Sequence, residues 1–267
     1  MKVFKIIIAL SILFIQGCTM IKITASKQRS DHPRSFEIQN GITVTTWGEI
    51  NVNKVDFFPS GFQIKFNRKV AYIDPVEIST DEKADYIFIT HSHPDHLSIR
   101  DIQRVLKPET RLVCPRSVEK KLRKLDCEIF ITKPGQNRDF SDIQYSAVPA
   151  YNTKPVFLWL KAHPKSKENV GYILRTAGGI SLYHAGDTDN VTELKEIKDD
   201  IDVAFLPIGG DNLTMNIEDA AKLANAINPK TVVPMHFEVK RSNELDQFKK
   251  LLDKNSEMRI MSSMEKH

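Results

Sequence analysis

The sequence predicts an α/β fold in which two mixed β-sheets pack against each other and helices flank them, an αββα sandwich. Two observations predict this class. Short β-branched and apolar runs follow one another closely in the first part of the chain, and strands then alternate with segments of helical spacing. At 267 residues the chain is long enough for one such domain with a sizeable core.

Each element follows from residue type and spacing. β-branched and aromatic residues between turn-forming residues predict strands at 42–46, 54–58, 61–66, 70–73, 85–90, 112–113, 129–131, 144–149, 170–174, 180–185, 203–207, 231–234 and 259–261. Apolar residues at helical spacing predict helices at 99–106, 116–125, 217–227 and 245–252. Asn216 is placed to cap the third helix.

The first residues differ from the rest of the chain. Two lysines precede a run at 6–15 that is apolar but for one serine, and Cys18 follows shortly after it. This run is too short to span a bilayer but fits the core of a secretory signal. The tetrapeptide Ile-Gln-Gly-Cys that ends at Cys18 resembles the bacterial lipobox. We therefore expect a lipoprotein-type signal peptide at 1–17, a polar tether at 18–40 and one domain at 41–267.

Lipid on Cys18 would make the protein an exported, membrane-anchored lipoprotein on the periplasmic or outer-surface side. A plain signal peptide or a short membrane anchor is the alternative interpretation of the same segment.

The remaining composition is that of an ordinary soluble domain, with 41% hydrophobic residues, 27% charged residues and a net charge of +4. The densest basic stretch, 120–124, lies on a predicted helix and fits its solvated face. Because no basic block is present that could follow a phosphate backbone, nucleic acid is not an expected partner. Cys114 and Cys127 lack the spacing of a metal or redox site, and an unbridged pair is favoured over a disulfide.

The most compact polar motif is Thr-His-Ser-His-Pro-Asp-His, directly after the strand predicted at 85–90. It places His91, His93, Asp95 and His96 within six positions. Imidazole nitrogen and carboxylate oxygen are ligands that zinc, iron and manganese accept. The motif therefore predicts a metal site, and its density favours two ions.

Two further predicted strands end in candidate ligands, Asp187 and His236. Ligands at separate strand ends can converge on one edge of a sheet sandwich. The pattern His-x-His-x-Asp-His, then Tyr-His-Ala-Gly-Asp-Thr-Asp ending at Asp189 and Val-Pro-Met-His ending at His236, resembles the metallo-β-lactamase superfamily. The motifs are similar to its branch that contains ascorbate-phosphate lactonase and the N-acylphosphatidylethanolamine phospholipase D.

This resemblance implies two divalent metal ions, with zinc favoured and manganese or iron as alternatives. Carried over by position, the implied ligands are His91 and His93 for the first ion, Asp95, His96 and His236 for the second, and Asp187 for both. Asp95 would also be the catalytic group that accepts a proton from, or orients, the water that the ions activate.

One histidine that the family carries is missing. The family places it after Pro-Ala-aromatic, where this chain reads Pro-Ala-Tyr and then Asn152. An asparagine carbonyl is a poor ligand for zinc, so His163 or His184 would have to compensate. Pro-Ala-Tyr-Asn followed by His-Pro-Lys is similar to a hydrolase-like subgroup, and we expect Asn152 and His163 to bind substrate. The alternatives are a buried strand histidine for His184 and a surface loop residue for His163.

The connection 153–169 is long for a compact domain, which favours a functional role. It carries an apolar run at 156–160 next to Lys161, Lys165 and Lys167. Such a patch over a metal site would suit an amphiphilic, lipid-like anionic substrate. The alternative is that the apolar run simply packs onto the sheet.

The sequence thus predicts a metal-dependent hydrolase that uses a metal-bound hydroxide on an ester, lactone, phosphodiester or amide of a small-molecule or lipid-like substrate. A β-lactamase proper is one alternative. A nuclease is disfavoured because a basic groove is missing. The remaining alternative is a binding or scaffold lipoprotein whose first metal site has decayed at Asn152.

Overall fold

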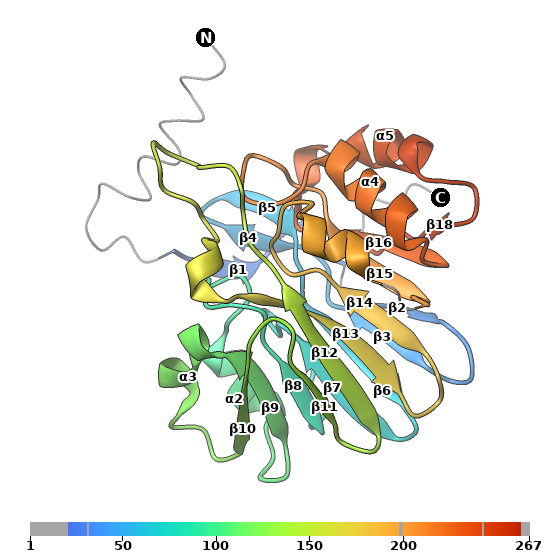
Figure 1. Ribbon diagram of the computed structural model, residues 1–267. Helices are drawn as coiled ribbons and strands as arrows, with labels where there is room; N and C mark the ends of the chain where they lie inside the picture. The colour runs from blue at the N-terminus through green and yellow to red at the C-terminus, as the bar shows by residue number, and fades with distance from the viewer. Residues whose placement is uncertain (1–20, 31, 198–199, 242, 263–267) are drawn as a thin grey trace.

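The computed structural model describes residues 21–30, 32–197, 200–241 and 243–262 (Figure 1). Over these residues the chain forms two seven-stranded sheets and a smaller four-stranded sheet. The α-helices are α2 (Ile99–Val105), α3 (Arg116–Leu122), α4 (Ile217–Ile227) and α5 (Asn243–Leu251). In Figure 1, α2 and α3 lie on one outer side of the layered sheets, and α4 and α5 lie on the other. The predicted αββα sandwich is confirmed.

The first large sheet is half parallel and half antiparallel. In spatial order its strands are β10 (Glu128–Thr132), β9 (Arg111–Pro115), β8 (Tyr86–Phe88), β7 (Lys69–Ile73), β6 (Phe62–Phe66), β3 (Thr43–Thr46) and β2 (Arg34–Glu37). The pairs from β10 to β7 are parallel and those from β7 to β2 are antiparallel.

The second large sheet also has one antiparallel half and one parallel half. Its strands in spatial order are β11 (Asn137–Asp139), β12 (Ile143–Pro149), β13 (Val170–Thr176), β14 (Ser181–His184), β15 (Val203–Pro207), β16 (Thr231–Met235) and β18 (Glu257–Met258). The pairs from β11 to β14 are antiparallel and those from β14 to β18 are parallel. Every residue of β15 is buried, as expected for a central strand covered on both faces.

The small sheet joins the start of the described chain to the strand that follows His236. Its order is β1 (Ile23–Ala25), β4 (Ile50–Val52), β5 (Val55–Phe58) and β17 (Phe237–Glu238), and every pair is antiparallel. The polar tether predicted at 18–40 is wrong where the structure describes that segment, because β1 and β2 lie within it and pair through their backbones. The predicted signal peptide at 1–17 and Cys18 lie outside the described residues.

Aromatic rings from both large sheets meet in the core between them. The ring centroids of Phe62 on β6 and Phe205 on β15 are 4.4 Å apart, and those of Phe88 on β8 and Tyr172 on β13 are 5.2 Å apart. The Tyr172 hydroxyl donates to the carbonyl of Ile89 at 2.7 Å. Since burying one such side chain contributes about 1.5–3 kcal/mol, this packing fixes the end of β8 against the second sheet.

The helices cover the outer faces with their apolar stripes. Ile102 of α2 and Val118 of α3 are fully buried against the first sheet. The side chain of Asn216 accepts a hydrogen bond from the amide of Asp219, so the predicted cap of α4 is confirmed. Short single-turn 3₁₀ segments complete the fold at η1 (Lys165–Lys167), η2 (Thr192–Glu196) and η3 (Val239–Arg241).

Cys114 and Cys127 are both free, which confirms the unbridged interpretation. Among the described residues, no helix combines the length and the apolar character that crossing a membrane would require.

Candidate metal centre

The carboxyl ends of three strands carry the candidate ligands. The histidine-rich motif follows β8, Asp187 follows β14 and His236 follows β16. Parallel pairing of β14, β15 and β16 brings Asp187 and His236 to one edge of the second sheet. His236 has a φ of 50°, a left-handed conformation that is uncommon outside glycine and that is concentrated at functional sites.

In the part of the chain that the structure describes, two adjacent groups of side chains are arranged as metal ligands. Within each group the ligand atoms lie within 4.8 Å of one another. The first cluster contains His91, His93, His163 and Asp187, and the second cluster contains Asp95, His96 and His236. All six predicted metal ligands are brought together, and His163 joins them.

The carboxylate of Asp187 faces both clusters. Its Oδ1 lies 3.3 Å from Nε2 of His96, and its Oδ2 lies 3.2 Å from Nε2 of His236 and 3.4 Å from Nε2 of His163. The residue is only 2% exposed. This is the position from which one anion can neutralise two neighbouring cations, as predicted for Asp187.

His163 takes the place of the histidine that the sequence lacks at Asn152. Its Nε2 lies 3.0 Å from Nδ1 of His93, and its ring centroid is 4.7 Å from those of His91 and His93. The residue is 1% exposed. The structure therefore places His163 among the ligand groups and not on an open surface where substrate would bind.

Asn152 lies behind His163 and holds it. Its Oδ1 accepts from the His163 amide at 3.0 Å and is 2.8 Å from the His163 Nδ1, while its own amide donates to the His163 carbonyl at 2.8 Å. The Asn152 side-chain nitrogen donates to the Leu213 carbonyl at 2.9 Å. The expectation that Asn152 binds substrate is corrected, because this side chain is fully buried and its polar atoms have protein partners.

His184 has a different surrounding. Its Nε2 lies 2.8 Å from the carbonyl of Ser60, and its Nδ1 accepts from the amide of Gly186 at 3.2 Å. Both nitrogens are thus used inside the protein, which agrees with the interpretation of a buried strand histidine. Between the two candidates, the geometry selects His163 as the replacement ligand.

Asp74 is a supporting group that the sequence analysis missed. It directly follows β7, and its carboxylate accepts from the Thr90 amide at 2.8 Å and lies 2.7 Å from Nδ1 of His96. The Thr90 hydroxyl lies 3.0 Å from Nδ1 of His91. Both rings therefore have their Nδ1 atoms engaged and turn Nε2 toward the clusters, as outer partners of metal-binding histidines do. The Asp-Pro pair at a strand end was the available signal.

The side chains of the two clusters differ in their protonation state. Burial lowers the pKa of His163 to about 4 and, with the nearby His96, lowers that of His91 well below its usual value. Burial opposes protonation of His96 too, but the carboxylates of Asp187 and Asp95 outweigh it and raise the pKa of His96 well above the usual value. The first cluster thus presents neutral imidazoles, while the second holds charge next to its carboxylates.

The donor atoms fit divalent metal ions. Nε2 of His91, Nε2 of His96 and Oδ1 of Asp187 are buried and make no hydrogen bond within the described structure. An unpaired buried polar atom costs about 1–3 kcal/mol, so several such atoms that converge indicate a missing ligand. Imidazole nitrogens with one or two carboxylates form a donor set that zinc, manganese and iron accept.

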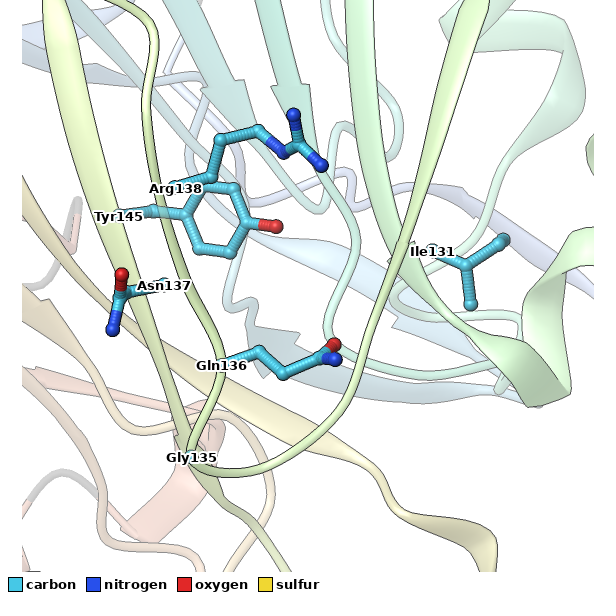
Figure 2. Close-up of a pocket in the computed structure, with 6 residues that line it drawn as sticks. All are labelled: Ile131, Gly135, Gln136, Asn137, Arg138 and Tyr145. Carbon is cyan, nitrogen blue, oxygen red and sulfur yellow. The ribbon is translucent and has the colours of Figure 1, made fainter.

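A separate cavity of about 220 Å³ lies away from these clusters (Figure 2). Its lining residues are Ile131, Gly135, Gln136, Asn137, Arg138 and Tyr145. None of them is a histidine, an acid or a cysteine, and the Arg138 guanidinium already stacks over the rings of Phe130 and Phe140. The chemistry of this molecule is therefore concentrated at the two histidine clusters.

Comparison with known proteins agrees with this geometry. Residues 55–237, which contain β5 to β17 and every residue of both clusters, match the family described as beta-lactamase superfamily domain. The chain belongs to this superfamily. Within it, the chain is a member of the UPF0173 family of metal-dependent hydrolases.

Two relatives illustrate the match. A UPF0173 metal-dependent hydrolase from Nanoarchaeum equitans is 31% identical over 180 residues, which cover 67% of this chain and 80% of the relative. A second from Geobacillus thermodenitrificans is 34% identical over 186 residues, covering 66% of this chain and 80% of the relative.

Solved structures share the fold. The crystal structure of a proposed metal-dependent hydrolase from Parabacteroides distasonis aligns with a TM-score of 0.68 and 32% identity, over 86% of this chain and 98% of that one. A metallo hydrolase from Ignicoccus hospitalis aligns with a TM-score of 0.59 and 23% identity, over 77% and 93% of the two chains. The metallo-β-lactamase fold is thus shown for this chain.

Proposed function

We propose that this hydrolase acts on an ester, lactone, phosphodiester or amide at a site for two divalent metal ions. The observation that carries the proposal is the position of Asp187, whose carboxylate faces His96 and His236 of the second cluster and His163 of the first. Two ions in such a site lower the pKa of water and polarise the scissile oxygen. His91, His93 and His163 would hold one ion, Asp95, His96 and His236 the other, and Asp187 both.

Asp95 supplies the proton acceptor. Burial would raise its pKa, but His96 and His236 outweigh burial and hold the pKa of Asp95 well below its usual value, so the group stays a carboxylate. Its Oδ2 is 3.3 Å from Nε2 of His236, and its side chain is 26% exposed. Asp95 can therefore take a proton from an attacking water.

The histidine-rich first cluster favours zinc, with manganese or iron as the alternatives. Among substrates, the motifs shared with the lactonase and phospholipase D branch support phosphodiesters and lactones first. Lys154 and Lys161 lie on the loop that leads to His163 and would attract an anionic substrate. The alternative of a decayed binding lipoprotein rested on Asn152, and it loses that support because His163 completes the first cluster.

The proposal also includes anchorage. The segment 1–18 supports export and a lipid on Cys18, so that the enzyme would work at a membrane on the periplasmic or outer-surface side. Incorporation of labelled fatty acid into the wild type and not into Cys18→Ser would support it. Equal labelling of both chains, or labelling of neither, would contradict it.

Metal content and hydrolysis test the chemistry. The purified chain, depleted of metal and reloaded with zinc or with manganese, would be assayed on phosphodiesters, lactones, thioesters and penicillins. We expect about two ions per chain in the wild type and in His32→Ala, a control at an exposed histidine outside the clusters. Asp187→Ala should lose metal and at least about a hundredfold in rate, because both ions depend on it. Equal metal content and activity in Asp187→Ala and the wild type would remove the two-metal proposal.

A further inference from the structure

The loop that supplies His163 ends in an exposed apolar tip. Phe157, Leu158, Trp159 and Leu160 are 40%, 64%, 77% and 39% exposed, and they account for four of the five large apolar side chains that are exposed among the described residues. The fifth, Leu251, lies alone on α5. Four consecutive exposed apolar residues form a continuous patch, and such patches mark contact surfaces.

The tip is an ordered turn and not a loose end. The amide of Val156 donates to the carbonyl of Leu160, and the amide of Leu160 donates to the carbonyl of Phe157, both at 2.8 Å. Leu158 has a φ of 50°, in the left-handed region that a leucine adopts at a cost. The strained conformation at Leu158 therefore holds apolar side chains in solvent, where packing against the protein does not offset its cost.

The base of the same loop is fixed at the first cluster. Asn152 and His163 pair with each other through their backbones and the Asn152 side chain. The carboxylate of Asp189 accepts from the Thr153 amide at 2.7 Å, and Asn212 donates to the Pro155 carbonyl at 2.9 Å. Whatever the tip contacts is therefore held within a few residues of a metal ligand.

The neighbouring charges indicate the chemistry of the partner. Lys154 and Lys161 flank the tip, are exposed and take part in none of the ion pairs found among the described residues. Tryptophan and leucine between lysines are the composition of segments that enter the interface of an anionic bilayer. A protein partner would not require this excess of one charge sign.

The course of the chain brings a membrane to the same end of the molecule. Near the start of the described residues, the backbone of Lys22 pairs with Asn53 in the turn between β4 and β5. Phe57 of β5 contacts the ring of His236 at a centroid distance of 6.0 Å. Figure 1 shows β1, β4 and β5 at the end of the sandwich where the yellow-green loop lies. Cys18 stands four positions before Lys22, a reach of at most about 14 Å.

We propose that the tip Phe157–Leu160 inserts into the interface of an anionic lipid bilayer and seats the metal centre against the headgroups. This inference rests on the proposed anchorage at Cys18. With a lipid on Cys18 and the inserted tip, the body would have two contacts with the membrane, which would fix its orientation.

Tryptophan fluorescence tests the proposal directly, because the chain has two tryptophans and only one is at the tip. Trp47 is 6% exposed and stacks on Tyr72, whereas Trp159 is 77% exposed. The full lipidated chain would be reconstituted into vesicles of phosphatidylethanolamine and phosphatidylglycerol with brominated acyl chains. We expect emission at shorter wavelength and bromine quenching in the wild type, and neither effect in Trp159→Phe.

Two variants sharpen the result. Combined Phe157→Ser and Leu158→Ser should reduce insertion of the tip about tenfold or more, because two apolar side chains are removed. Leu251→Ser, the matched control on α5, should leave quenching of Trp159 unchanged.

Other occupants of the tip give different results. Unquenched Trp159 in chains that carry lipid on Cys18 would overturn the insertion and leave the anchorage standing. A blue shift that follows protein concentration and not bromine would identify a second copy of the chain and would also overturn it. Because the measurement needs no catalysis, a failure of the proposed hydrolysis would not change its outcome.

Discussion

Asn152 decides which nitrogen of His163 faces the first cluster. An imidazole whose Nδ1–H donates to a carbonyl oxygen carries its free electron pair on Nε2, the atom available to a metal ion. Here the Asn152 Oδ1 lies 2.8 Å from Nδ1, and Nε2 lies beside His93 and Asp187. Asn152 is therefore a positioning residue for His163, the ligand that takes the place of the histidine expected at position 152.

We expect Asn152→Ala to weaken metal binding at the first cluster about 10- to 100-fold, the usual effect of removing an outer partner of a ligand. Asn152→Asp keeps the acceptor for Nδ1 but loses the donor to the Leu213 carbonyl and faces Asp189, so its affinity should lie between those of the alanine variant and the wild type. Titration with a competing chelator would measure both variants. An affinity in Asn152→Ala equal to that of the wild type would show that the Leu213 carbonyl, 3.1 Å from Nδ1, suffices to orient the ring.

Gly209 leaves room for the strained backbone of His236. A Cβ added at Gly209 would lie 2.3 Å from the His236 carbonyl oxygen, a distance that backbone atoms must move to relieve. We expect Gly209→Ala to destabilise the fold by about 1–3 kcal/mol and to lower metal occupancy at the second cluster. Urea unfolding and metal analysis would check this. Gly178→Ala, where the nearest atom is 3.5 Å away, is the control and should be tolerated.

At the scale of elements, the loop 153–162 depends on the carboxylate of Asp189. That group accepts from the amide and the hydroxyl of Thr153 at 2.7 and 2.6 Å and from the side chain of Asn152 at 3.2 Å. The turn after β14 therefore holds the base of the loop in place. Through Asn152 it also holds His163.

Asp189→Ala should loosen this loop, because three donors lose their acceptor at once. Limited proteolysis would then cut within 153–162 faster than in the wild type. Added metal would slow this cleavage less in the variant than in the wild type. Asp211→Ala removes an exposed acid that pairs with Arg241 outside the loop and serves as the control. Equal cleavage rates in all three proteins would argue that Asn152 and His163 close the loop by themselves.

The elements that sequence patterns predicted and those they missed differ in physical kind. Strands such as β15 and β16 are buried and almost entirely apolar, so composition alone marks them. The missed strands carry weaker signals. β11 reads Asn-Arg-Asp and is fully exposed, and β2 pairs through its backbone although its side chains are largely polar. Edge strands of this kind are held by their neighbours, which no local pattern records.

The site divides in the same way. His91, His96, Asp187 and His236 stand directly after predicted strands, so strand order was enough to bring them together. His163 reaches the cluster only because it pairs with Asn152, a loop residue eleven positions earlier in the chain. Similarity to the family revealed that a histidine is missing at position 152. The structure was needed to select His163 over His184 as the replacement ligand.

At the scale of the whole molecule, the metal centre joins the two sheets. His91 to His96 extend from the first sheet, while Asp187 and His236 extend from the second. Each cluster therefore combines ligands that follow strands of both large sheets, and Asp187 faces both clusters. Bound ions would therefore act as cross-links across the edge of the sandwich, where aromatic packing gives way to buried polar groups.

Removal of metal should consequently lower the stability of the entire domain. An ion present at a hundred times its dissociation constant stabilises the folded state by about 2.7 kcal/mol, and in a domain of this size each kcal/mol shifts the unfolding midpoint by about 2–4 °C. We expect chelation to lower the midpoint measured by circular dichroism by roughly 5–10 °C per ion, and excess zinc to restore it. Asp187→Asn should respond much less to both treatments, since one substitution removes the shared ligand. A midpoint that chelation leaves unchanged in the wild type would mean that the sandwich closes without its metals.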